Sequence, residues 1–248
     1  MLAIQNKILE FGKDYCKDKS IKEVRLGLGY SCAELSDGCM GVAWTPEERA
    51  CTCTQLSCAG KMAGMSAESA LSMLVSRSSL ERAVGLATFN AINISIQREC
   101  NDDDILNIID IKANEHVVMV GYFAPLVPAI KNTGCKFDVA ELKTDKPGVI
   151  SKDDGLEALK KCDVAIITAT SIINGTLDGI LEALGNVREA VILGPSTPMC
   201  KEVFAKTKIT RLSGSYVMNN EGVKLIISEG GGTKLLKKHL RFTTVNVV

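Results

Sequence analysis

The chain has 248 residues, of which 46% are hydrophobic and 23% are charged, a composition that supports a buried core and excludes a disordered chain. The 29 basic residues balance 29 acidic ones, so the basic excess typical of nucleic-acid-binding proteins is missing. Only 4% of the residues are aromatic, which argues against a base-stacking surface. We expect one large or two small domains and no nucleic-acid partner.

The first 20 residues carry charges from Lys7 onward and lack an apolar stretch followed by a cleavage site, so they do not resemble a signal peptide. The longest apolar runs, such as 164–167, are too short to cross a bilayer. We therefore expect a cytoplasmic protein without membrane insertion. Thiols stay reduced in the cytoplasm, so the ten cysteines do not predict a set of disulfides.

The first half of the chain predicts a helix, a hairpin and further helices. An amphipathic helix is indicated by the spacing of Ile4, Ile8, Phe11 and Tyr15. Two β-rich runs, 23–35 and 39–45, flank an Asp-Gly turn and predict an antiparallel hairpin. Helices are expected at 67–75, at 79–96 with Ser79 as the N-cap, and at 105–110. Together these elements predict a smaller α+β domain over residues 1–111.

From residue 112 the pattern changes to short apolar strands that alternate with helices. Strands are expected at 117–120, 136–142, 163–169, 190–194, 209–217 and 224–232. Continuous apolar strands of this kind are typical of a parallel sheet that is covered on both faces. Residues 112–248 are thus predicted to form an α/β domain, a Rossmann-like doubly wound parallel sheet. The basic segment 234–242 is expected to close it as a helix.

Small and hydroxyl-bearing residues follow three of these strands. Ligands of parallel sheets bind outside the carboxyl ends of the strands, so the three turns are expected to converge on one cleft. The predicted ligand-binding residues in these turns are Gly121, Tyr122, Phe123, Thr168, Thr170, Ser171, Asn174, Thr176, Gly194, Pro195, Ser196 and Thr197. Each turn alone is equally consistent with an ordinary helix start.

The turn after the first strand bears on the kind of ligand. It holds a single glycine, Gly121, followed by Tyr122 and Phe123, so it lacks the three glycines of the dinucleotide fingerprint. Glu141 nevertheless follows Gly121 by 20 residues, where a Rossmann acid accepts hydrogen bonds from ribose hydroxyls. This combination disfavours NAD and FAD and predicts a nucleoside-like ligand such as adenosylmethionine. The alternative is that Glu141 is a solvated acid at a strand end.

Three cysteines, Cys51, Cys53 and Cys58, fall within eight residues. In an extended segment Cys51 and Cys53 share a face, so the trio is a candidate ligand set for a soft metal ion. No nearby histidine or C-x-x-C pair completes a four-ligand zinc site, and no base accompanies a cysteine to make it a nucleophile. The alternative is that the cysteines pack as small buried apolar residues.

Several motifs together resemble the heavy-metal-chelation family. They are VVMVGYFAPLV (117–127), Glu141, the segment 163–178, GPSTP (194–198) and EGGG (229–232). SDGCMGVAW (36–44) and the segment 79–93 extend the resemblance to nearly the whole chain. It implies a domain like the enolase N-terminal fold followed by a Rossmann-like domain. It also implies a small-molecule site between the two, to which Arg82 and Asn90 would contribute from the first domain.

The leading hypothesis is a small-molecule enzyme or ligand-binding protein that acts on a chelator-, pterin- or nucleoside-like compound, with a role in heavy-metal chelation. The alternatives are a thiol-based metal-binding or metal-delivery protein and a partner subunit of a metal transporter. The residues identify no catalytic group. A homodimer is the default expectation for the assembly.

Overall fold

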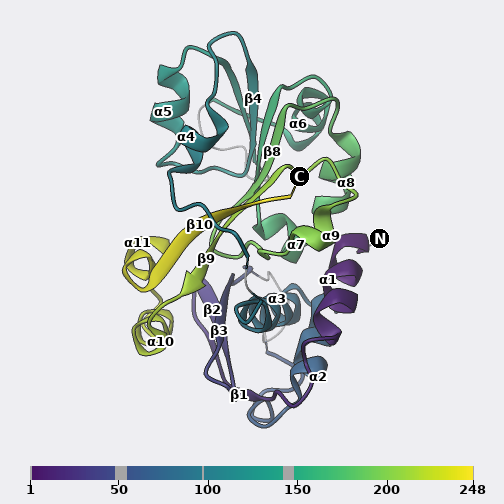
Figure 1. The fold of residues 1–248 in the computed structure, drawn as a ribbon, viewed down its shortest axis with the longest axis vertical. Helices are drawn as coiled ribbons and strands as arrows, with labels where there is room; N and C mark the ends of the chain where they lie inside the picture. Colours follow the sequence, from purple (N-terminus) through teal and green to yellow (C-terminus); the bar gives the residue numbers. More distant parts are fainter. Residues whose placement is uncertain (1, 48–54, 97, 142–147, 248) are drawn as a thin grey trace.

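The computed structural model describes residues 2–47, 55–96, 98–141 and 148–247. Two sheets organise them: a three-stranded sheet in the N-terminal part (residues 2–96) and a seven-stranded sheet in the C-terminal part (residues 98–247) (Figure 1). Among these residues no helix combines the length and the apolar character needed to cross a membrane.

The three-stranded sheet is antiparallel and consists of β1 (Ile21–Leu26), β2 (Tyr30–Leu35) and β3 (Met40–Trp44). The sequence run 23–35, predicted as one strand of a hairpin, is therefore two strands. The chain turns between them at residues 27–29, where the Gly27 N–H donates to Tyr30 O at 2.9 Å. The additional turn is consistent with the two glycines in this segment, Gly27 and Gly29.

Helices cover one face of this sheet. They are α1 (Ala3–Lys13), α2 (Ala67–Ser72), the short 3-10 helix η1 (Met73–Val75) and α3 (Ser79–Asn93). The N-cap of α3 is Ser78, whose hydroxyl accepts the Glu81 N–H, whereas the sequence predicted Ser79 as the N-cap. Gly41 of β3 permits close packing, since a β-carbon there would overlap backbone atoms of Ala87 and Ala91 in α3.

The seven-stranded sheet has the order β10-β9-β8-β7-β4-β5-β6. Its strands are β4 (His116–Val120), β5 (Lys136–Ala140), β6 (Val149–Ile150), β7 (Val164–Thr168), β8 (Glu189–Leu193), β9 (Arg211–Val217) and β10 (Leu240–Asn246). Strands β4 to β9 pair in parallel and β10 is antiparallel to β9. The chain runs outward from β4 through β5 to β6 and then crosses to β7, so the topological switch point lies between β4 and β7.

Helices cover both faces of this sheet, which makes it doubly wound. On one face, α4 (Ile105–Ile109) and α5 (Val127–Asn132) pack through Ile105, Ile109 and Ile130. On the other face lie α6 (Lys152–Leu159), α7 (Thr170–Asn174), α8 (Leu177–Ala183) and α9 (Lys201–Phe204). The predicted fold class, a Rossmann-like sheet preceded by a smaller α+β unit, is confirmed.

Two C-terminal predictions are wrong. The segment 224–232, predicted as a strand, belongs mainly to α10 (Asn220–Ser228), whose N-cap Asn219 accepts the Gly222 N–H. The segment 234–242, predicted as a helix, contains α11 (Thr233–Leu236), the 3-10 helix η2 (Lys237–His239) and the beginning of β10. Both α10 and α11 pack on the three-stranded sheet, where Val223, Ile227 and Leu236 contact the cluster around Tyr30 and Val42.

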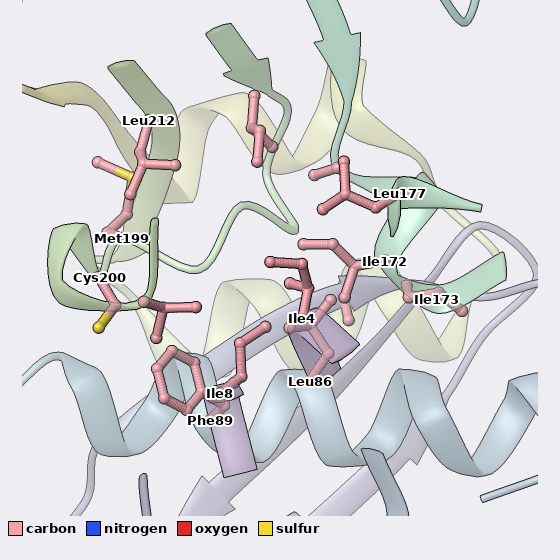
Figure 2. Packing of buried hydrophobic residues seen from close by; sticks show 14 of the residues in the cluster. Ile4, Ile8, Leu86, Phe89, Ile172, Ile173, Leu177, Met199, Cys200 and Leu212 are labelled. Carbon is pink, nitrogen blue, oxygen red and sulfur yellow. The ribbon is translucent and has the colours of Figure 1, made fainter. Parts of the chain in front are cut away.

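One apolar core joins the two parts of the chain. Figure 2 shows Ile4 and Ile8 of α1 and Leu86 and Phe89 of α3 packed near Ile172, Ile173 and Leu177 of the C-terminal part. The N-terminal part is thus in direct contact with α7 and the start of α8. The boundary between residues 111 and 112 stays a prediction.

Candidate functional site

A cavity of about 270 Å³ lies at the carboxyl edge of β4, β5 and β7, beside the topological switch point. Its polar lining comes from the segments that follow these strands and from α6, which crosses from β6 to β7. The lining residues are Val120, Gly121, Ala140, Glu141, Lys152, Gly155, Leu156, Leu159, Thr168, Thr170, Ser171, Asn174, Gly175, Thr176, Gly179 and Ile180.

Gly121 brings the first turn into contact with β7. Its φ of 90° lies in the left-handed region, which side chains other than glycine rarely adopt. Its N–H donates to Ala140 O at 2.8 Å, which ties the end of β4 to the end of β5. A β-carbon on Gly121 would also meet the Thr168 side chain, so the turn depends on glycine for two separate reasons.

One wall of the cavity is built from hydroxyl groups. Thr168 Oγ1 lies 3.1 Å from Thr170 Oγ1 and accepts the Thr170 N–H at 3.3 Å. The Ser171 hydroxyl donates to Thr168 O at 2.7 Å, so its oxygen lone pairs can still accept a hydrogen bond. Asn174 and Thr176 continue this wall. It therefore offers donors and acceptors to a polar ligand without carrying a charge.

Two charged groups complete the lining. Glu141 follows β5 directly, and its Oε2 accepts the Tyr122 N–H at 3.1 Å. Lys152 opens α6, and Gly155 in the same helix lets α6 approach β5, since a β-carbon there would overlap that of Ala140. The Lys152 side chain is exposed and forms no ion pair with the described residues. The cavity therefore has a carboxylate and an ammonium group beside the hydroxyl wall.

Seven of the residues predicted from the sequence line this cavity: Gly121, Glu141, Thr168, Thr170, Ser171, Asn174 and Thr176. Tyr122 and Phe123 do not. Tyr122 is exposed, and Phe123 packs against the apolar cluster beneath α4 and α5. The turns that follow β4 and β7 thus meet at this cavity, whereas the sequence predicted that three turns would converge.

The turn 194–198 lies elsewhere, at the contact between the two parts of the chain. Ser196 Oγ accepts the Trp44 N–H at 2.8 Å, and Ser196 O accepts a hydrogen bond from Asn90 Nδ2 at 3.2 Å. The Thr197 hydroxyl is within hydrogen-bond distance of Gly194 O at 2.7 Å. Pro195 O accepts the Ser215 hydroxyl at 3.4 Å. These groups pack against β3 and β9 and do not line the cavity.

Arg82 and Asn90 also engage backbone carbonyls. Arg82 donates to Ser76 O at 2.8 Å, to Arg77 O at 2.9 Å and to Ile173 O at 2.5 Å. Asn90 donates to Val42 O at 2.9 Å. The described lining of the cavity comes from residues 120–180 alone, so it lies inside the C-terminal part, whereas the family resemblance implied a site between two domains.

Sequence reasoning missed the contribution of α6. Lys152 and Gly155 line the cavity, although no strand-end motif marks them. The available signal was the helix start at Ser151, whose hydroxyl accepts the Asp154 N–H. It predicts where the helix begins but gives no information on which strand the helix approaches.

The cysteines could serve as metal ligands or as packing residues. Cys51 and Cys53 lie outside the described residues, while Cys58 packs half-buried beside a small apolar cluster. Within the described residues, no three His, Cys, Asp or Glu side chains are placed to hold a metal ion. Burial raises the pKa of Cys16, Cys32 and Cys162 to about 11 and that of Cys200 to about 12. These four thiols are therefore protonated near neutral pH and pack as apolar groups.

Two family models match the chain. One, described as "Putative heavy-metal chelation", matches residues 104–246, and a second with the same description matches residues 10–93. The chain belongs to this heavy-metal-chelation family. The resemblance found in the sequence is thereby confirmed.

The chain is also similar to individual proteins. An uncharacterized protein of Methanocaldococcus jannaschii is 26% identical over 177 residues, which cover 68% of this chain and 67% of the relative. The crystal structure of a family member with unknown function from Pyrococcus horikoshii is 23% identical, covers 98% of this chain and 99% of its own, and has a TM-score of 0.86. A family member from Desulfitobacterium hafniense is 21% identical, with coverages of 99% and 98% and a TM-score of 0.83. These structures share the fold of both parts of the chain.

Proposed function

We propose that this member of the heavy-metal-chelation family binds a small, nucleoside-like metabolite in the cavity beside the topological switch point. The observation that carries the proposal is the convergence of Gly121, Glu141 and the segment 168–176 on one cavity. Open α/β sheets bind ligands at this position, outside the carboxyl ends of the strands at the point where the strand order reverses.

The lining matches the parts of such a ligand. Glu141 follows the second strand and lines the cavity; in our proposal it accepts hydrogen bonds from ribose hydroxyls, as the acid at this position of a Rossmann fold does. Leu156, Leu159 and Ile180 supply apolar surface for a flat ring, and the hydroxyl wall supplies hydrogen bonds for its polar edge. The volume of about 270 Å³ is near the lower end of the range for ligand pockets, roughly 300–1,000 Å³, which favours a single nucleoside over a dinucleotide.

Lys152 favours a ligand that also carries an acidic group. Its ammonium group forms no ion pair with the described residues and belongs to the same lining as Glu141. A carboxylate on the ligand would satisfy it. Adenosylmethionine combines a ribose with a carboxylate and is therefore the first compound to test.

The description of the family connects this site to metals. We propose that the bound compound, a chelator-, pterin- or nucleoside-like metabolite, is processed or carried in heavy-metal chelation. The metal ion is then cargo of the pathway. The described lining contains a single carboxylate and neither a thiol nor an imidazole, so it suits the organic compound better than a bare soft ion.

Thermal-shift screening tests the proposal. The panel contains adenosylmethionine, its demethylated product, nucleosides and pterins. A compound at a hundred times its Kd should stabilise the protein by about 2.7 kcal/mol. The double variant Thr170→Ala/Asn174→Ala should lose this stabilisation, whereas Ser196→Ala, outside the cavity, should keep it. The proposal is wrong if no compound stabilises the protein, or if the double variant responds like the wild type.

A thiol-based metal-binding protein is the second candidate, favoured by the three cysteines within residues 51–58. Elemental analysis of protein purified without chelators separates the two. A metal content that falls in the Cys51→Ser/Cys53→Ser/Cys58→Ser variant supports thiol binding, and an equal metal content in both proteins contradicts it.

A further inference from the structure

Much of the hydroxyl wall of the cavity belongs to a helix that is too short to be stable by itself. Helix α7 has five residues, from Thr170 to Asn174, and contributes Thr170, Ser171 and Asn174 to the lining. Isolated helices of this length are not stable in water. The last carbonyls of a helix also have no partner within it. The shape of the wall must therefore depend on contacts from outside α7.

Two buried side chains of the N-terminal part supply those contacts. Gln5 of α1 donates from Nε2 to Ile172 O at 2.6 Å, and Arg82 of α3 donates from Nε to Ile173 O at 2.5 Å. Gln5 is 1% exposed and Arg82 is 9% exposed. Figure 2 shows the same contact from its apolar side, where Ile4 lies near Ile172. Neither Gln5 nor Arg82 lines the cavity.

In a third contact the C-terminal part supplies the side chain and the N-terminal part supplies the backbone groups. Helix α1 begins at Ala3, and its N-cap residue, Leu2, offers no side-chain hydrogen bond. Asp178, in the first turn of α8, takes this role: its carboxylate accepts the Ala3 N–H at 2.7 Å and the Ile4 N–H at 3.1 Å. Capping of this kind stabilises a helix start, and the negative charge also suits the helix dipole.

The segment between these contacts belongs to the cavity. Gly175 and Thr176 connect α7 to α8, and both line the cavity. Gly179, the residue directly after Asp178, lines the cavity as well. A β-carbon on Gly175 would lie 3.0 Å from Leu2 Cδ2, so the back of this segment rests on the first residues of the chain that the structure describes. The wall is thus held at Ile172, at Ile173 and at Asp178.

We infer that Gln5, Arg82 and Asp178 are positioning residues that set the shape of the cavity wall from behind, so that ligand binding depends on three side chains outside the cavity. The inference rests on the proposed function, because it concerns the same cavity. It assigns the N-terminal part a role in that function: it holds α7 and the start of α8 in the geometry that binds.

Hydrogen–deuterium exchange of the full chain tests the positioning directly, without a ligand. The variants are Gln5→Met, which keeps a helix-forming side chain of similar size but removes the donor, and Asp178→Ala, which removes the cap. We expect exchange of the amides in 171–178 to rise about fivefold to tenfold, the change that loss of one hydrogen bond gives. Exchange in β8 should stay unchanged. The matched control is Asn6→Ala, since Asn6 Nδ2 donates to Leu2 O, next to α1, and to no residue of the cavity wall that the structure describes.

Ligand affinity supplies the second measurement, with the compound that stabilises the wild type in the screen as the probe. We expect its Kd to rise at least fivefold in Gln5→Met and in Asp178→Ala. Asp178→Asn, which keeps one acceptor oxygen, should restore most of the affinity. A control destabilised far from the cavity, Arg188→Met, which loses the ion pair with Glu115, should keep the wild-type Kd.

The two measurements separate the failure of each idea. If the exchange of 171–178 equals that of the wild type in Gln5→Met and Asp178→Ala, the positioning inference is wrong whatever the ligand does. If exchange rises but Kd stays unchanged, these residues are structural only, and the inference is again wrong. If exchange rises and no compound binds the wild type, the proposed function fails while the mechanical part of the inference holds.

Discussion

A β-carbon on Gly121 would lie 2.8 Å from Cβ and Cγ2 of Thr168, so the end of β4 and the end of β7 are in contact at the floor of the cavity. Side chains at both positions could not be accommodated without a shift of one strand end. This contact keeps the first turn close to the hydroxyl wall.

Gly121→Ala should therefore remove ligand binding and destabilise the protein. The left-handed backbone alone costs an alanine about 1–2 kcal/mol, and the overlap with Thr168 adds about 1–3 kcal/mol. Gly38→Ala is the matched control, because Gly38 has a φ of 84° but nothing within 4 Å of a β-carbon. Urea unfolding measures both. Equal losses of unfolding free energy in the two variants would contradict the close contact.

Lys152→Met should change specificity and leave stability nearly unchanged. The side chain is exposed, and substitutions at such positions usually stay within about 0.5 kcal/mol. Binding of adenosylmethionine should weaken about tenfold through loss of a charge-assisted hydrogen bond, while binding of adenosine, which has no carboxylate, should not change. Lys161→Met, at an exposed lysine two residues after the end of α6, is the control. Isothermal titration calorimetry decides, and equal weakening for both compounds would rule out the carboxylate contact.

Ser196→Ala should destabilise the contact between the two parts without affecting the cavity. The change leaves the Trp44 N–H without its acceptor, which costs about 1–3 kcal/mol. Trp44 is the single tryptophan, so its fluorescence reports on this contact directly, and a red shift is expected. Ser72→Ala, whose hydroxyl donates to Glu68 O at an exposed position, is the control. A weaker ligand-induced thermal shift in Ser196→Ala would instead place Ser196 in the site.

Glu34 should make the protein sensitive to acid. Burial alone would raise the pKa of Glu34, but hydrogen bonds from Lys22, Lys224 and Asn220 lower it overall. Because the folded pKa lies below the unfolded one, near 4.3, the stabilisation is fully present above the unfolded pKa. It is lost as the pH falls through the folded pKa.

Two measurements check this behaviour. Glu34→Gln should lose about 1.5–3 kcal/mol at pH 7, because the buried Lys224 loses one charged hydrogen-bond partner while it keeps Glu23 and Glu221. The variant should also show a shallower decline of unfolding free energy between pH 5 and pH 3. The control is Glu157→Gln, which breaks the exposed pair with Lys160. An acid decline in Glu34→Gln as steep as that of the wild type would assign the effect to other carboxylates.

Local sequence predicted the elements whose burial is uniform. The runs 117–120 and 164–167 are apolar throughout and lie in β4 and β7 at the centre of the sheet. The segment 224–228 also carries strand-forming residues, but it is the helix α10, because Val223 and Ile227 share the face that packs on the three-stranded sheet. The final strand β10 depends on pairing with β9, a contact that the local pattern does not contain.

The residues of the candidate site could be predicted where they directly follow a parallel strand, because the strand end fixes the edge of the sheet at which they lie. Thr168 and Gly121 follow neighbouring parallel strands, so their meeting could be expected. Ser196 also follows a parallel strand, yet its hydroxyl faces Trp44, because β3 occupies the space that a ligand would need. Whether a polar turn faces a ligand or another part of the chain is decided by tertiary packing, which is also why Lys152 was missed.

The cap of α1 has a consequence for biosynthesis. Ala3 and Asp178 are 175 positions apart in the sequence, so a ribosome must add 175 residues after Ala3 before helix α1 receives its capping carboxylate. During that interval the apolar face of α1, with Ile4 and Ile8, also lacks the partners from α7. Helix α1 consequently reaches its native environment only after a much later part of the chain has been synthesised.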